Sequence, residues 1–245
     1  MSILLLNDSA AAGPSGPLPV QSGLLAMYRM DEAAGQTLLD SSGAARDATL
    51  GSTAGADTND PAWVPAGLSF STDDYVSCAA HAAMRPNAWT VCVATKLTAG
   101  VVNPILGWHT SSQVPAVFGA APFNQNRPLI WLANNCFRYF EKNNPVNIQD
   151  GGWHFLVFTC PGNSAADILS STMTVDGQLQ AVSSTTGSED GAGKTTCRIG
   201  ASGTTYYGAC ETAFFALHDR VLSGGEQEQM REYARAALEG RVTLP

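Results

Sequence analysis

The chain has 245 residues, 44% of them hydrophobic and 14% charged, which is enough for one large domain or two small ones. The net charge of −8 argues against nucleic-acid binding, because neutralising phosphates requires a basic surface. No apolar run approaches the ~20 residues that a membrane-spanning helix needs. No basic segment with a long apolar core begins the chain, so we expect neither membrane insertion nor a signal peptide.

Residues 1–22 have the composition of an arm. Ile3, Leu4, Leu5 and Leu6 form a short apolar hook, and the segment that follows is rich in Ala, Gly, Pro and Ser. Such a composition cannot build a core of its own, and the prolines make it a semi-rigid spacer. The hook has two possible acceptors, an edge of its own sandwich or a neighbouring subunit. We favour the neighbour, either another protein or a second copy of this chain, bound by main-chain pairing.

Short strands are predicted along the next part of the chain. Runs of apolar residues bounded by turn residues predict strands at 24–29, 68–70, 75–78 and 89–97, with a polar loop at 51–65. The stretch 89–97 alternates strictly between two faces. Further strands are predicted at 104–108, 116–118, 129–132 and 136–140, separated by polar loops.

The stretch 151–184 contains the strongest strand signal. Residues 153–160 are mostly aromatic or β-branched and are apolar on both faces, with glycines before them and Pro161-Gly162 after them. A strand with two apolar faces lies inside a sheet that is covered on both sides. Residues 172–175 form a second strand, and Asp176-Gly177 predicts a hairpin turn.

The C-terminal segment predicts a single helix. Ser223 and Glu226 have the spacing of a capping box, and Gly240 ends the helix. Apolar residues at helical spacing form a stripe that we expect to dock on the sheets: Met230, Tyr233, Ala234, Ala237 and Leu238.

Eight short motifs occur in a characteristic order. They are M-D-E-x-x-G, L-x-D-S-S-G, L-x-F-x-x-x-D-Y-V, W-T-V, G-x-W-H-x-x-x-x-T, V-D-G, R-I-G and D-R-x-L-S-x-x-E. Over residues 23–239 this order resembles the concanavalin A-like, laminin G-like jelly rolls. The resemblance implies an all-β, two-sheet antiparallel jelly-roll sandwich over residues 23–222, with a C-terminal helix and tail at 223–245. It also implies binding of sugars or proteins, in some members with calcium.

Catalysis is not expected. A glycosidase of this fold needs two carboxylates about 5 Å apart, which on one strand means a spacing of two or four residues. The adjacent acidic pairs of this chain lie in turns, so the glucanase hypothesis is disfavoured. His154 and His218 have no Ser or Cys partner at motif spacing, and we expect both to be structural. The six cysteines contain no C-x-x-C pair, which predicts reduced thiols in the core.

The ligand-binding candidates come from the region that matches the family least. They combine aromatic rings, which stack on sugars, with amides, which bind hydroxyls: Trp108, His109, Asn124, Asn126 and Trp131. The alternative is that each tryptophan belongs to the core. Asp73 and Asp74 are candidate calcium ligands, but we favour a role in capping backbone N–H groups, and we expect no metal and no cofactor.

Two functions remain open. The tail G-R-V-T-L-P resembles the ends of laminin G-like proteins of tailed bacteriophages. The first hypothesis is therefore a non-enzymatic virion structural protein, a capsid-decorating or tail-associated adhesion module. It would be made in the host cytoplasm and held to other virion proteins or to copies of itself by its arm, with a cell-surface glycan as a further partner. The alternative is a free carbohydrate-binding lectin module.

Overall fold

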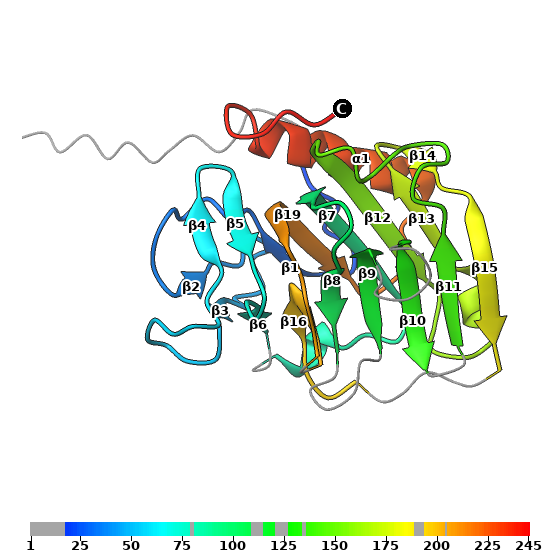
Figure 1. Ribbon diagram of the computed structural model, residues 1–245, viewed down its shortest axis with the longest axis horizontal. Coiled ribbons are helices and arrows are strands. Elements are labelled where there is room, and N and C mark those ends of the chain that lie inside the picture. Colours follow the sequence, from blue (N-terminus) through cyan, green and yellow to red (C-terminus); the bar gives the residue numbers. More distant parts are fainter. Residues whose placement is uncertain are drawn as a thin grey trace, which may run out of the picture.

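The computed structural model describes residues 18–78, 81–108, 115–120, 127–133, 136–188, 194–203 and 205–245. These residues form two stacked antiparallel sheets and one α-helix (Figure 1), which confirms the predicted all-β sandwich with a C-terminal helix. The predicted strands of residues 24–160 are present to within a few residues at each end.

The first sheet contains the longest strands. Its members are β1 (Leu24–Tyr28), β4 (Ala62–Val64), β5 (Gly67–Phe70), β7 (Trp89–Leu97), β12 (His154–Cys160), β13 (Thr172–Val175), β14 (Gln178–Leu179) and β19 (Cys210–His218). Within the described residues their order is β14-β13-β12-β7-β19-β5-β4, and β1 also pairs with β19. Two of these strands were not expected from the sequence. Strand β19 lies in the middle of the sheet, and β4 lies inside the loop predicted at 51–65, where it pairs with β5.

The second sheet lies in front of the first in Figure 1. Its strands are β2 (Thr37–Leu38), β3 (Ala48–Leu50), β6 (Val76–Ser77), β8 (Asn103–Gly107), β9 (Ala116–Ala120), β10 (Leu129–Ala133), β11 (Cys136–Phe140), β15 (Val182–Gly187) and β16 (Arg198–Ile199). Their order is β15-β11-β10-β9-β8-β16-β6-β3-β2.

Three small elements complete the sandwich. A hairpin of β17 (Ala201–Ser202) and β18 (Tyr206–Tyr207) lies against β8. The approach is so close that a Cβ atom on Gly107 would lie 2.5 Å from the Ala201 carbonyl oxygen, so only glycine is accommodated there. Two short 3₁₀ helices, η1 (Ala82–Met84) and η2 (Asp167–Ser170), connect strands.

The two faces of β12 enter two different cores, as its sequence predicts. Leu156 and Phe158 face the core between the sheets, whereas Phe155 and Val157 face the opposite side. Because every second side chain points the same way along a strand, an apolar residue at every position requires a covering layer on both sides. All six cysteines are buried free thiols.

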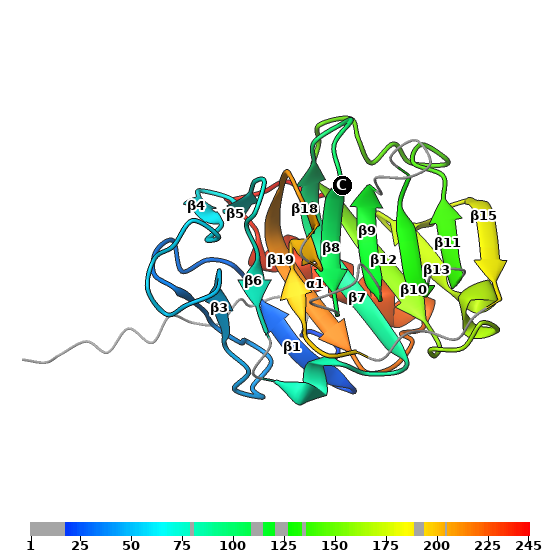
Figure 2. The ribbon, with the colours of Figure 1, turned by 60° about the horizontal axis from the view of Figure 1, so that its bottom comes forward.

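Helix α1 (Gly224–Ala237) is the layer on the outer face of the first sheet (Figure 2). Met230, Tyr233 and Ala234 are buried in one cluster with Phe155 and Phe214 of the sheet. The capping box is present: the Ser223 hydroxyl accepts from the Glu226 backbone N–H, and the Glu226 carboxylate accepts from the Ser223 backbone N–H.

A β-bulge interrupts β19 where it pairs with β7. The register shifts between Thr212, which is opposite Thr95, and Phe214, which is opposite Ala94. Ala213 and Phe214 consequently both enter the helix-side cluster, although they are adjacent in sequence. An extra residue in one strand of an antiparallel pair has this effect, because it reverses the facing of the residues beyond it.

Candidate functional site

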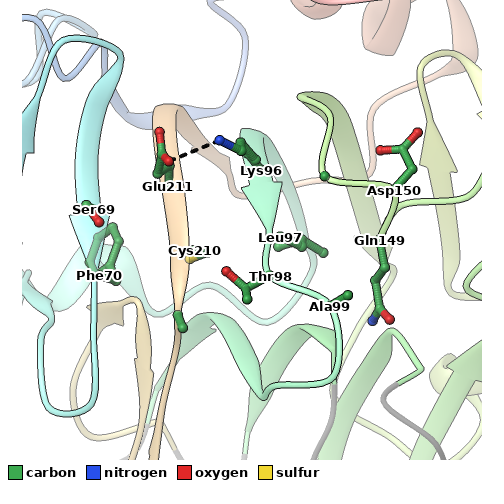
Figure 3. Close-up of a pocket in the computed structure, with 12 residues that line it drawn as sticks. Ser69, Phe70, Lys96, Leu97, Thr98, Ala99, Gln149, Asp150, Cys210 and Glu211 are labelled. Atoms are coloured by element: carbon green, nitrogen blue, oxygen red, sulfur yellow. Dashed lines mark hydrogen bonds and ion pairs between the residues drawn. The ribbon is translucent and has the colours of Figure 1, made fainter.

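A polar cleft opens at one end of the first sheet (Figure 3). It has a volume of about 570 Å³ and is lined by residues 69–70, 96–99, 149–151 and 209–211. Strands β5 and β7 end there, while β19 begins there because it runs antiparallel to both. The loop before β12 forms the remaining wall. We call this site the polar cleft.

An ion pair crosses the wall formed by β7 and β19. Lys96 lies directly opposite Glu211 in the strand register, and its Nζ is 3.2 Å from Glu211 Oε1. Lys96 follows Cys92 and Ala94 on the outer face of β7, but it lies beyond the part of that face that α1 covers. Both side chains stay partly exposed, and such a pair contributes little to stability. It does place one ammonium and one carboxylate at the cleft.

Asp150 faces the cleft from the loop before β12, and 49% of its side chain is exposed. Its Oδ1 accepts hydrogen bonds from the Gly152 backbone N–H, at 2.7 Å, and from His154 Nε2, at 3.1 Å. These two bonds lower the pKa of the Asp150 carboxyl below its ordinary value, and the bond from Gly152 has the larger effect. Asp150 is therefore ionised at neutral pH.

His154 lies behind Asp150, between two carboxylates. Its Nδ1 is 2.7 Å from Asp176 Oδ2, and the other oxygen of Asp176 accepts from the Phe155 backbone N–H. Burial alone would lower the pKa of His154, but the hydrogen bonds to Asp176 and Asp150 outweigh burial and raise it. With an acceptor at each ring nitrogen, the imidazolium form donates at both.

A tight turn positions Asp176. Asp176 and Gly177 have φ angles of 52° and 82°, and both follow the last residue of β13. Two successive positive φ angles are typical of a type I′ hairpin turn, which the Asp-Gly pair predicted. The turn places the Asp176 side chain beside the first residues of β12.

The structure corrects the prediction for Trp108. Its ring has no exposed surface and packs on the ring of Trp89, with centroids 5.2 Å apart. Its Nε1 donates to the Met84 carbonyl oxygen at 2.7 Å. The ammonium of Lys194 lies 4.7 Å from the Trp108 ring centroid. Trp108 is thus a core residue, the alternative recognised from the sequence, and offers no ring face to a sugar.

Trp131 packs in a different cluster from Trp108. It belongs to an aromatic cluster with Phe118 and Tyr139, separate from the core between the sheets, and it is 8% exposed. Tyr206 of β18 packs edge-on against Phe118, with centroids 5.9 Å apart. None of these residues lines the polar cleft. The other predicted ligand contacts, His109, Asn124 and Asn126, lie outside the described residues.

The two calcium candidates make the contacts of turn residues. Asp74 Oδ2 accepts from the Ser71 backbone N–H at 2.7 Å, and Asp73 Oδ2 accepts from Asn59 Nδ2 at 3.2 Å. Across the described ranges, no group of three or more His, Cys, Asp or Glu side chains is arranged to hold a metal ion.

The predicted arm is described only from residue 18 onward, so Ile3, Leu4, Leu5 and Leu6 lie outside the described residues. Val20 is 6% exposed and packs with Met230 of α1. The Val20 carbonyl oxygen lies 3.0 Å from His218 Nε2, and Gln229 Nε2 donates to the Leu18 carbonyl oxygen. The last residues of the predicted arm therefore pack on their own domain, and the predicted boundary at residue 22 falls inside this contact.

The two-sheet sandwich with its outer helix defines a domain of the jelly-roll lectin type. Residues 70–226 match the family described as the concanavalin A-like lectin/glucanases superfamily. The chain belongs to this family. No curated protein matches the chain in sequence. In the described residues, no helix is long and apolar enough to cross a membrane.

Solved structures share the fold at low sequence identity. A Trypanosoma rangeli sialidase in complex with sialic acid is 16% identical with a TM-score of 0.55, over 88% of this chain and 33% of the sialidase. The binding domain of Paraclostridial Mosquitocidal Protein 1 is 10% identical with a TM-score of 0.53, over 86% of this chain and 52% of that one. The binding domain of Botulinum neurotoxin DC, in complex with rat synaptotagmin II, is 11% identical with a TM-score of 0.54, over 88% and 52%. This chain thus spans about a third to a half of these proteins.

Proposed function

We propose that the protein is a non-enzymatic recognition module that binds a carbohydrate in the polar cleft. The observation that carries this proposal is the grouping of Lys96, Glu211 and Asp150 around a cleft of about 570 Å³. Carboxylates accept hydrogen bonds from sugar hydroxyls and an ammonium donates to them. Phe70 and Leu97 add apolar surface to the lining. Few polar groups on a partly apolar wall are the usual composition of small-ligand sites.

Membership of the lectin/glucanase superfamily supports carbohydrate as the ligand class. Among similar structures, one is a sialidase with sialic acid bound and two are binding domains of toxins. At these identities they support the fold, so the ligand of this chain is argued from the cleft itself.

The absence of turnover is part of the same proposal. A glycosidase requires one carboxyl group whose raised pKa keeps it protonated as a general acid. In the polar cleft, the pKa of Asp150 is lowered by the bonds from Gly152 and His154, and Glu211 is paired with Lys96. Both features favour ligand binding over proton transfer.

We also propose that this recognition module is carried on a virion. This placement is supported by the resemblance of the tail at residues 240–245 to laminin G-like proteins of tailed bacteriophages. An adhesion module on a particle would use the polar cleft for a cell-surface glycan and the hook at residues 3–6 of the arm for attachment. Mass spectrometry of purified phage particles from the producing cells tests it, and finding the chain only in the soluble fraction would contradict it.

A glycan array with purified protein tests the binding proposal. We expect a defined set of glycans to bind the wild type, and Asp150→Ala and Lys96→Ala to lose at least about tenfold in affinity, as for loss of a charge-assisted hydrogen bond. Glu239→Ala is the matched control, because Glu239 is exposed and lies outside the lining of the polar cleft. Binding that survives both cleft variants, or no binding to any glycan, would refute the proposal.

Turnover is measured on the glycans that bind. We expect no release of reducing sugar above a heat-inactivated sample. Release that disappears in Asp150→Asn or Glu211→Gln would refute the non-enzymatic part of the proposal while leaving the binding part intact.

A further inference from the structure

The charges at the polar cleft do not cancel. The ammonium of Lys96 is 3.2 Å from Glu211, so each offsets the other. Asp150 shares one hydrogen bond with His154, but His154 also faces the buried Asp176 at 2.7 Å. With His154 protonated, these five groups contribute three carboxylates and two cations, which leaves one negative charge; with His154 neutral, the negative excess is larger.

That charge is located at Asp150. Asp176 is almost completely buried and both of its oxygens are engaged, one by His154 and one by the Phe155 backbone N–H. The side chain of Asp150 is half exposed, and Asp150 belongs to the lining of the cleft; Figure 3 shows it on the loop before β12. The whole chain, at −8, adds to the negative potential rather than offsetting it.

We infer that the polar cleft selects sugars that carry a free amino group over the same sugars with that group acetylated, and that it disfavours acidic sugars. This inference rests on the proposed carbohydrate function and names its ligand class. An ammonium donating to the Asp150 carboxylate makes a charge-assisted hydrogen bond, about twice as strong as one between neutral groups. A carboxylate on the ligand would meet Asp150 with like charge, and Lys96, the ammonium among the described residues that line the cleft, is already paired with Glu211.

Asp150 is held in one orientation, which favours a ligand amine at one location in the cleft. Two bonds, from Gly152 and His154, hold one carboxylate oxygen. The side chain therefore has a fixed orientation before a ligand arrives, which reduces the entropic cost of binding. A mobile surface carboxylate would attract amines without favouring one location on the sugar.

The test compares matched sugars. Isothermal titration calorimetry at pH 6 and low salt uses chitosan pentaose, its fully N-acetylated counterpart, and a pair of glycans that differ only by a terminal sialic acid. We expect the wild type to bind the free amine roughly fivefold to tenfold more tightly than the acetylated form, as for one partly exposed charge pair. The sialylated glycan should bind more weakly than its unsialylated counterpart.

Asp150→Asn separates charge from shape. The amide keeps the size of the side chain, so the preference for the amine should fall to about twofold or less, whereas Glu239→Gln should retain the wild-type preference. Raising the salt concentration should also reduce the preference, because exposed charges are screened.

Three results would overturn the inference. They are equal or tighter binding of the acetylated sugar, a preference that persists in Asp150→Asn, and binding of other neutral glycans on the array without binding of the amino sugar. In each case a carbohydrate still binds, and the proposed function stands. No binding to any glycan is the distinct result that removes both.

Discussion

Asp176→Asn isolates the contribution of the buried carboxylate beside His154. The left-handed backbone at residue 176, with a φ of 52°, accommodates Asn, and the Asn side-chain oxygen is able to accept from the Phe155 backbone N–H as Asp does. The substitution therefore leaves the turn and one hydrogen bond in place. It removes the negative charge that faces His154 Nδ1 at 2.7 Å.

The expected loss is about 2–3 kcal/mol of unfolding free energy at pH 6. A hydrogen bond to a charged group contributes about 1.5–3 kcal/mol, and His154 and Asp176 are each only 7% exposed at the side chain, so solvent does not replace it. The loss stays below the ~3–5 kcal/mol of a broken buried ion pair, because His154 is able to release its proton in the variant and because Asp150 still faces its Nε2.

The loss should depend on pH with a definite sign. Because the pKa of His154 is raised in the folded protein, the folded state binds the proton more tightly than the unfolded state. The stabilisation is complete below the ordinary histidine pKa of about 6.5 and disappears as pH rises through the raised value. The difference between wild type and Asp176→Asn should therefore be largest near pH 6 and shrink toward pH 10.

Urea unfolding followed by tryptophan fluorescence measures this difference at several pH values. Asp31→Asn is the matched control, because Asp31 pairs with Arg29 on the surface and such pairs contribute at most about 1 kcal/mol. A difference under about 0.5 kcal/mol at pH 6, or one that does not change up to pH 10, would refute the assignment of an imidazolium between two carboxylates.

Three further changes test the packing. Phe158→Ala removes a fully buried ring between the sheets, and urea unfolding should show a loss of about 3–5 kcal/mol; a loss under about 1 kcal/mol would contradict its burial. Gly67→Ala would place a Cβ 2.4 Å from the Thr212 carbonyl oxygen, so the melting temperature should fall by several degrees, and an unchanged melting curve would show that β5 and β19 are not so close. Val20→Ala removes two methyl groups packed near Met230 and should cost about 1–2 kcal/mol, whereas an unchanged stability would mean that residues 18–22 do not pack on α1.

The fold was predictable because most strands carry a clear local signal. Residues 89–97 form an apolar and β-branched run that is a strand with both faces covered, and the Asp-Gly turn at 176–177 has the predicted conformation. Strand β19 is one exception, because its bulge puts Ala213 and Phe214 on one face and so breaks the alternation that identifies a strand. Strand β4 is another, because its three residues lie at the end of a segment that reads as a polar loop.

The polar cleft was not predictable in the same way. Lys96, Asp150 and Glu211 come from distant parts of the chain and line one cleft only because β7 pairs with both β19 and β12. No spacing rule connects them. The aromatic candidates were chosen by residue type, and Trp108 shows the weakness of that choice, because a tryptophan next to polar residues in sequence is here a core side chain.

The bulge in β19 has a consequence for how this sandwich tolerates change. With unbroken alternation from Phe215, which faces the core, Glu211 would face the core as well. The extra residue shifts the alternation by one position. Glu211 therefore lies beside Lys96 on the outer face, while Phe215 still faces the core. The residues before the bulge and those after it thus follow separate inward and outward alternations. A substitution of Glu211 therefore changes the outer end of β19 without changing which face of the strand Phe215 occupies.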